Sequence, residues 1–213
     1  MGDAAAITPA IPQLASGKRG RDPLHILVAT LISARTKDAV TAAATERLFS
    51  LAGTAAELSR LDPSQVASAI YPAGFYRIKG RQIVSAAQTL RDDHGSGVPS
   101  TREDLMALPG VGRKTANLVL GVAFGIPAIC VDTHVHRISN RVGWVATSTP
   151  LTTEEELMRL LPRDCWIDVN RVLVGFGQRL CTPRSPSCHQ CPLSRCCPKI
   201  GVAAPSPATP SQR

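Results

Sequence analysis

Short apolar runs with helical spacing, separated by turns rich in proline and glycine, recur along most of the chain. The run "LHILVATLISA" follows Asp22-Pro23, and an aspartate N-cap before proline at the first helical position marks a helix start. "DPSQ" at 62–65 repeats that signal, and "STRE" at 100–103 and "TTEE" at 152–155 are typical of capping boxes. No run alternates apolar and polar residues well enough to require a sheet. The pattern predicts an all-α protein of short helices joined by tight turns.

The stretch "LPGVGRKTANLVLGVAFG", residues 108–125, predicts a hairpin of two helices. A short helix over 100–107 leads into a tight turn at 109–112, and a second, largely apolar helix begins near residue 113. The second helix continues into the longest uncharged run of the chain, 115–131, which is 17 residues long. Asn117, two glycines and Pro127 interrupt this run, so we expect a buried helix and no membrane span.

The start of the second helix carries an unusual charge pattern. Arg113 and Lys114 stand in its first turn, where a cation is disfavoured by about 0.3–1 kcal/mol because the N–H groups there are partly positive. In the turn Gly110-Val111-Gly112, the two glycines permit positive φ and a close approach of another backbone. Their N–H groups and those of the helix start form an anion site. A DNA phosphate bound there would offset the repulsion of the cations and bind independently of base sequence.

The net charge indicates the kind of binding partner, and the first residues of the chain indicate the cellular compartment. The net charge is +8 and the pI is about 9.5, with 12 Lys/Arg against 6 Asp/Glu in residues 108–213. An excess of this kind on one half suggests a polyanion, nucleic acid first. The start of the chain lacks a basic region followed by an apolar core, so we expect no signal peptide and a cytoplasmic, nucleoid-associated protein.

Four of the seven cysteines lie within 17 residues, in a C-x6-C-x2-C-x5-C pattern: Cys181, Cys188, Cys191 and Cys197. Four thiolates suit zinc and iron–sulfur clusters alike, and the spacing alone leaves both open. Cys196 competes with its neighbour Cys197 as the fourth ligand. Cys130 and Cys165 have no partners at ligand spacing, and we expect both to be small buried apolar groups.

"LPGVGRKTAN" followed by "VDTHVHRISNRV" at 131–142 resembles the helix-hairpin-helix DNA glycosylases, and within them the endonuclease III family. The likeness extends from about residue 23 to 198. It implies a six-helix barrel domain with the helix-hairpin-helix at 23–126 and an iron–sulfur cluster domain made of 1–22 and 127–200. The first 20 residues show no sustained period, and we expect the proline-rich segment 201–213 to be a disordered tail.

The same resemblance implies a bifunctional DNA glycosylase and AP lyase of base excision repair that removes oxidised pyrimidines. It makes Lys114 the nucleophile and Asp132 its catalytic partner. A neutral lysine amine can attack C1′ of the sugar and form a Schiff base, after which β-elimination cleaves the strand. The helix N-terminus and Arg113 both favour the neutral amine. Asp132 also fits an N-cap of the helix "THVHRISNRV", and capping and catalysis are compatible.

The resemblance further implies a [4Fe–4S] cluster on the four-cysteine loop, with Cys197 selected over Cys196 by the family spacing. Arg184 in that loop is a candidate for phosphate contact. The expected partner is double-stranded DNA containing damaged pyrimidines or abasic sites, and we expect a monomer. His134 and His136 lie two residues apart, which does not suit a metal pair on a helix.

Two further positions concern the base pair at the lesion. The target base must leave the stack, and in the family a residue from the loop here written "PAGFYRIKG" fills the gap, which places Phe75 there. Packing of Phe75 in a helix interface is the alternative. The family typically has glutamine where this chain has Arg35, and arginine can fork onto guanine, so we expect an altered opposite-base preference. Arg77, Lys79 and Arg81 are expected to be solvated or to face phosphates.

Two other functions stay open on the sequence alone. An AP lyase with weak glycosylase activity is one, because Arg35 changes the position that fills the void beside the lesion. A non-catalytic helix-hairpin-helix DNA-binding protein is the other, although the combination of Lys114 with Asp132 argues against it. An adenine-excising relative is disfavoured because such relatives lack this lysine.

Overall fold

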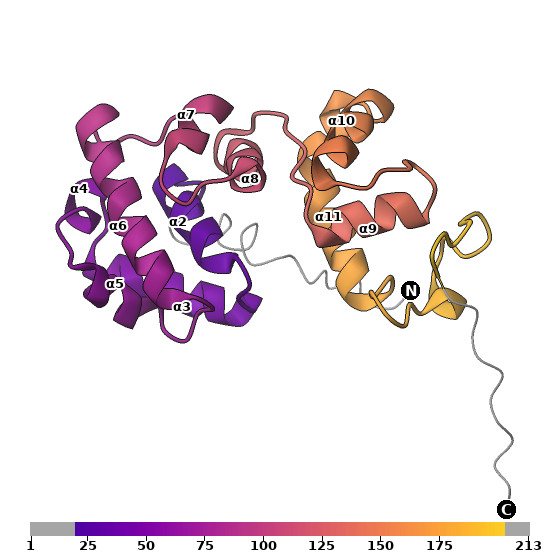
Figure 1. Ribbon diagram of the computed structural model, residues 1–213, viewed down its shortest axis with the longest axis horizontal. Helices are drawn as coiled ribbons and strands as arrows, with labels where there is room; N and C mark the ends of the chain where they lie inside the picture. Colours follow the sequence, from indigo (N-terminus) through magenta and orange to yellow (C-terminus); the bar gives the residue numbers. More distant parts are fainter. Residues whose placement is uncertain (1–19, 203–213) are drawn as a thin grey trace, which may run out of the picture.

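All regular structure between residues 20 and 202, the range that the computed structural model describes, is helical. The prediction of an all-α protein is therefore confirmed for that range. The expectations for the first 19 residues and for 203–213 concern segments outside the described residues. Figure 1 shows two lobes, one built from the earlier helices and one from the later helices, joined by the segment that follows α8.

The first lobe packs around α2, whose residues Leu24 to Ile32 are all buried. A helix buried on every side suits a segment with almost no polar residue, and Thr30 satisfies its hydroxyl by donating to the Ile26 carbonyl oxygen at 2.7 Å. The helices of this lobe are α2 (Pro23–Ser33), α3 (Asp38–Leu51), α4 (Ala55–Leu58), α5 (Pro63–Ile70), α6 (Tyr76–Asp93), α7 (Arg102–Ala107) and α8 (Arg113–Phe124).

The second lobe has its own apolar core, centred on Ile129, Val135, Ile138 and Leu157. Its elements are α9 (Thr133–Arg141), α10 (Pro150–Leu160), the short 3-10 turn η1 (Arg163–Cys165), α11 (Trp166–Arg179) and the 3-10 turn η2 (Cys188–Gln190). The first core includes Ala128 and the second begins at Ile129, so the chain passes from one core to the other within a single extended segment.

Side-chain capping explains most helix starts. Asp22 and Asp62 cap α2 and α5 as predicted, and Gln65 completes the capping box of α5. Two predicted starts are displaced. The cap of α7 is Thr101, one residue after the first residue of "STRE". The "TTEE" prediction is wrong, because Thr149 caps α10 and residues 152–155 lie inside that helix.

Within the described part of the chain, no helix combines the length and apolar character that crossing a membrane requires. The 17-residue uncharged run instead divides between α8 and the extended segment that follows it. α8 ends at Phe124, and its C-cap Gly125 has φ +67°, a left-handed conformation in which glycine carries no steric penalty.

Candidate active site and cysteine pocket

The hairpin between α7 and α8 is anchored from inside and presents its glycines outward. Val111 is buried in the first core, whereas Gly110 and Gly112 are exposed. Gly110 has φ +82°, and a Cβ there would lie 2.9 Å from the side-chain amide carbon of Gln82, so both its conformation and its neighbour require glycine. Gly112 instead has an extended backbone, with φ −98°, and caps α8 without a side chain. Both glycines permit positive φ, and of the two Gly110 adopts it.

Lys114 is an exposed side chain in the first turn of α8, as the hairpin pattern predicted. Asp132 is half-buried at the N-terminus of α9, and its Oδ1 accepts hydrogen bonds from the backbone N–H groups of His134 at 2.9 Å and Val135 at 2.8 Å. The predicted N-cap role of Asp132 is confirmed. An N-cap of this kind contributes about 1 kcal/mol and fixes the carboxylate in one rotamer.

The charges of Lys114 and Asp132 both influence the pKa values of Cys130 and His134. Burial raises the pKa of the Cys130 thiol to about 12, with Lys114 opposing that rise and Asp132 adding to it. Burial lowers the pKa of His134, with Asp132 opposing that change and Lys114 adding to it. Both charges therefore lie in one electrostatic neighbourhood, where Cys130 stays a neutral thiol. Cys130 is 2% exposed, which confirms its expected role as a buried apolar group.

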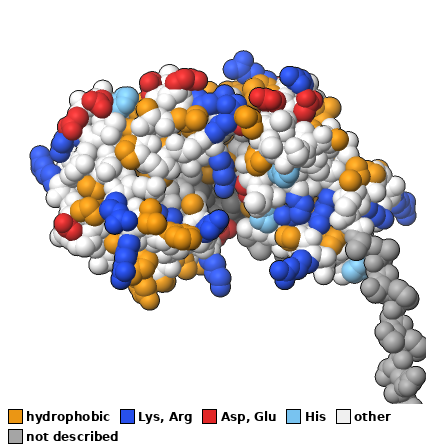
Figure 2. Space-filling model, viewed as in Figure 1, with side chains coloured by type: hydrophobic (Ala, Val, Ile, Leu, Met, Phe, Trp, Pro, Cys, Tyr) orange, Lys and Arg blue, Asp and Glu red, His pale blue; other side chains and the backbone are white. Residues whose placement is uncertain are grey.

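The two lobes face each other near this neighbourhood. Burial lowers the pKa of His134 in the second lobe, and Asp38, at the start of α3 in the first lobe, weakly opposes that change, so a charge of one lobe acts on a side chain of the other. Figure 2 shows a furrow between the lobes with Lys and Arg side chains gathered along its rim. A furrow with this charge suits an anionic polymer.

Arg113 makes an ion pair that the sequence did not reveal. Its Nε and one terminal nitrogen donate to the two carboxylate oxygens of Glu154 at 3.0 and 2.9 Å. Glu154 lies in α10, is 3% exposed, and also has Arg102 at 3.9 Å. These hydrogen bonds raise the pKa of Arg113, and the carboxylate offsets the field that Arg113 exerts on its neighbour Lys114.

Arg35 and Phe75 meet at the surface of the first lobe. Phe75 is 57% exposed at the N-terminus of α6, with φ +58°, and Arg35 is exposed in the turn after α2, with φ +53°. The Arg35 guanidinium carbon lies 5.6 Å from the centre of the Phe75 ring, a cation–π arrangement. Two non-glycine residues with left-handed backbones in direct contact indicate a constrained surface feature. Packing of Phe75 in a helix interface is excluded by its exposure.

Lys79 is buried beneath the turn that carries Arg35, contrary to expectation. It is only 5% exposed, so the prediction that it is solvated or faces a phosphate is wrong. Its Nζ donates to the carbonyl oxygens of Ile32 and Ala34, both at 2.6 Å, and to Thr36 Oγ1 at 2.9 Å. Lys79 thus satisfies the carbonyl groups at the end of α2 and fixes the turn that carries Arg35.

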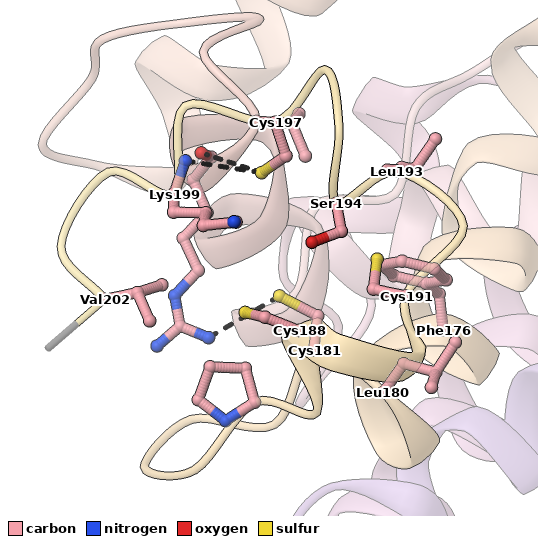
Figure 3. A pocket seen from close by; sticks show the side chains of 13 residues that line it. Phe176, Leu180, Cys181, Cys188, Cys191, Leu193, Ser194, Cys197, Lys199 and Val202 are labelled. Atoms are coloured by element: carbon pink, nitrogen blue, oxygen red, sulfur yellow. Dashed lines mark hydrogen bonds between the residues drawn. The ribbon is translucent and has the colours of Figure 1, made fainter. Parts of the chain in front are cut away.

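The four cysteines of the C-terminal loop line one pocket (Figure 3). Cys181 follows α11, Cys188 begins η2, Cys191 comes directly after η2, and Cys197 belongs to the following loop. Cys196 does not line the pocket; it is exposed, and its Sγ points to the Leu193 carbonyl oxygen at 3.4 Å.

The buried Arg141 supports this loop from α9. Its guanidinium donates to the Thr182 and Pro183 carbonyl oxygens, both at 2.6 Å, and lies 3.5 Å from Cys181 Sγ. Arg184, exposed in the same loop, stays a predicted phosphate contact. Cys165 is exposed beside α11, so its predicted burial is wrong.

The family model for the HhH-GPD superfamily base excision DNA repair proteins matches residues 28–163. Endonuclease III of Thermotoga maritima is 47% identical over 176 residues, which cover 83% of each chain.

The chain belongs to the endonuclease III family.

Solved structures agree with that assignment. A trapped covalent endonuclease III–DNA intermediate in an estranged-adenine complex superposes with a TM-score of 0.80 at 36% identity, covering 89% of this chain and 91% of that one. A non-covalent endonuclease III–DNA complex gives a TM-score of 0.79 at 38% identity, with 84% of each chain covered. The predicted helix-hairpin-helix glycosylase fold is confirmed, and as a member of the endonuclease III family the protein is a DNA glycosylase and AP lyase of base excision repair.

Endonuclease III proteins are generally associated with a [4Fe–4S] cluster, and the cysteine pocket can be tested for its fit to that group. Among residues 20–202, no three His, Cys, Asp or Glu side chains converge closely enough to hold a single metal ion. Tetrahedral zinc needs four ligand atoms about 2.0–2.3 Å from one point, whereas a [4Fe–4S] cluster takes one thiolate at each of four separate irons. The four cysteines that line the pocket match the number and type of ligands, four thiolates, that a [4Fe–4S] cluster takes.

Proposed function

We propose that this endonuclease III removes oxidised pyrimidines from duplex DNA through a Schiff base on Lys114 and then cleaves the strand by β-elimination. The observation that carries the proposal is the placement of an exposed lysine and a fixed aspartate in one electrostatic neighbourhood, beside a furrow with a basic rim. The solved relative named as a trapped covalent intermediate supports a covalent route on DNA.

In this mechanism the neutral amine of Lys114 attacks C1′ of the damaged nucleotide and displaces the base. The sugar ring opens to an imine, and abstraction of a sugar proton expels the 3′ phosphate. Asp132 stabilises positive charge that develops on the sugar and relays protons after the attack. Its hydrogen bonds to the start of α9 hold the carboxylate for both tasks.

A DNA phosphate bound at the hairpin would offset the positive charge of the N-terminus of α8, where Lys114 lies. The exposed glycines Gly110 and Gly112 let a DNA backbone approach the N-terminus of α8, where N–H groups favour an anion. The buried side chain of Val111 anchors the turn in the first core. Arg113 is hydrogen-bonded to Glu154, whose carboxylate offsets the positive charge of Arg113 beside Lys114. Arg184 is a further phosphate contact from the cysteine loop.

The Arg35–Phe75 pair fits the task of entering the stack. An exposed aromatic ring can occupy the gap left by an everted nucleotide, and a guanidinium beside it can fork onto guanine on the other strand. We propose that this pair fills the void and favours guanine as the opposite base.

The pocket ligands proposed for the [4Fe–4S] cluster are Cys181, Cys188, Cys191 and Cys197. The cluster would supply cross-linking of the C-terminal loop. Arg141 of α9 contacts Cys181 and hydrogen-bonds to the turn that follows it, and so it connects the cysteine loop to the helix that Asp132 caps.

Borohydride trapping on duplex DNA containing thymine glycol tests the nucleophile. The wild-type protein is expected to form a stable covalent complex, and Lys114→Ala is expected to form none. Lys37→Ala is the matched control, since Lys37 is also an exposed lysine at a helix N-terminus. Undiminished trapping in Lys114→Ala would remove Lys114 from this role.

Asp132→Asn separates catalysis from capping. An asparagine oxygen can still accept the two N–H bonds of α9, so the melting temperature is expected to stay near that of the wild type. The single-turnover rate should fall about 100-fold or more, because the charge and the proton relay are lost. An unchanged rate would reduce Asp132 to a helix cap.

A further inference from the structure

The separation between Lys114 and Asp132 depends on a segment that neither residue belongs to. Lys114 lies in the first turn of α8, and Asp132 caps α9 after the extended segment 126–131. The lysine helix packs in the first core, whereas the end of this segment belongs to the second. Whatever fixes the segment against α8 therefore sets the geometry of the proposed site.

Asn117 makes that connection. It is 1% exposed and lies three residues after Lys114, on the same face of α8. Its Nδ2 donates to the Ile129 carbonyl oxygen at 2.9 Å, and Ile129 precedes Asp132 by three residues. One short side chain thus joins the helix of the lysine directly to the connecting segment that leads into the aspartate.

The amide of Asn117 is held in a single orientation. Arg102 Nε donates to Asn117 Oδ1 at 2.9 Å, so the other end of the amide must face Ile129. Glu154 in turn lies 3.9 Å from Arg102 and pairs with Arg113 at 2.9 Å. The buried carboxylate of Glu154 therefore interacts with two arginines of the hairpin. Arg113 is the neighbour of Lys114 in the chain, and Arg102 hydrogen-bonds to Asn117.

We propose that Asn117, oriented by Arg102 and Glu154, is a positioning residue that sets the distance between Lys114 and Asp132. The inference rests on the catalytic roles proposed for those two residues. A displacement of about 1 Å in a reacting group can cost on the order of 100-fold in rate, so one hydrogen bond at this point has a large effect on chemistry. DNA binding depends on other surfaces and is not expected to change.

Asn170 provides a matched control. It is also buried, and its Nδ2 donates to the next carbonyl oxygen, that of Cys130, at 3.1 Å. Asn170 belongs to α11, in the lobe of Asp132, and so it steadies the segment without joining it to the lysine helix. A purely structural role for Asn117 predicts equal consequences for the two asparagines.

The test compares Asn117→Asp with Asn170→Asp in the full chain. Each substitution keeps the shape of the side chain and removes the donor to the carbonyl oxygen. We measure the single-turnover rate at saturating thymine-glycol DNA, the Kd for DNA carrying a tetrahydrofuran abasic analogue, and the free energy of unfolding. Asn117→Asp is expected to lower the rate about 10- to 100-fold with Kd within about twofold of the wild type. Asn170→Asp is expected to lose stability comparably but much less rate.

An unchanged rate in Asn117→Asp, a loss confined to Kd, or equal rate losses in both variants would overturn the proposal. If Asn117→Asp does not fold, Arg102→Leu decides, because it frees the amide while leaving Asn117 in place. This variant should lower the rate in the same direction, and a wild-type rate would contradict the inference. Trapping that persists in Lys114→Ala refutes the proposed nucleophile, whereas normal Lys114-dependent trapping with a full rate in Asn117→Asp refutes only the positioning role.

Discussion

Lys79→Met removes the three hydrogen bonds at the end of α2 while keeping most of the packing. Methionine matches the length of the lysine stem and suits a buried position. The carbonyl oxygens of Ile32 and Ala34 and the hydroxyl of Thr36 lose their common donor. The Ile32 oxygen is buried, whereas the other two groups are partly accessible to water.

The expected loss follows from that accessibility. A hydrogen bond to a charged group contributes about 1.5–3 kcal/mol, and a buried unsatisfied acceptor costs about 1–3 kcal/mol. With water replacing the lysine at Ala34 and Thr36, we expect Lys79→Met to lower the free energy of unfolding by about 2–4 kcal/mol. Arg81→Met, on the exposed side of the same helix, should change it by less than about 0.5 kcal/mol.

The difference between wild type and Lys79→Met should also depend on pH. Burial lowers the pKa of Lys79 from 10.5 to about 8 in the folded protein. Between these values the unfolded chain binds more protons than the folded one, so the stability of the wild type relative to the variant rises with pH. Urea unfolding of both proteins at pH 7.5 and pH 9.5 measures the change. If the difference in stability between the two proteins is the same at both pH values, or shrinks as the pH rises, the expected effect of Lys79 is wrong.

Three further substitutions test other parts of the account. Arg35→Gln is expected to reduce the ratio of excision rates opposite guanine and opposite adenine, since the side chain that can fork onto guanine is lost; an identical ratio would exclude that role. Cys197→Ser should lose visible absorption, iron and sulfide, whereas Cys196→Ser should retain all three, and the reverse result would exchange the ligands. Gly177→Ala should lower stability by about 1–3 kcal/mol in calorimetry, because a Cβ there would lie 2.5 Å from His134 Nδ1.

The helical elements and the hairpin were accessible from the sequence because their signals are local. Asp22, Asp62 and Asp132 each cap the helix that follows them, as an aspartate immediately before a helical segment predicts. The failures arose where tertiary contacts compete with local ones. Glu154 was assigned to a helix start, yet it lies in the second turn of α10 and is buried against Arg113.

The supporting residues of the site could not be predicted for the same reason. Lys79 donates to carbonyl groups more than 40 residues away in the chain, and no spacing rule connects such partners. In the sequence Asn117 is evident only as a polar interruption of an uncharged run, and Asn170 carries no signal of its own. The roles of Lys114 and Asp132 and the domain boundary near residue 126 stay predictions, although the hairpin and the cap on which they depend are present.

The site of the covalent adduct shows which amine of the protein attacks the sugar. Wild-type protein is trapped on abasic-site DNA with borohydride, the complex is digested with protease and nuclease, and the modified peptide is located by mass spectrometry. We expect a reduced deoxyribose adduct on Nζ of Lys114. An adduct on any other amine of the chain, or strand cleavage with no adduct at all, would contradict it.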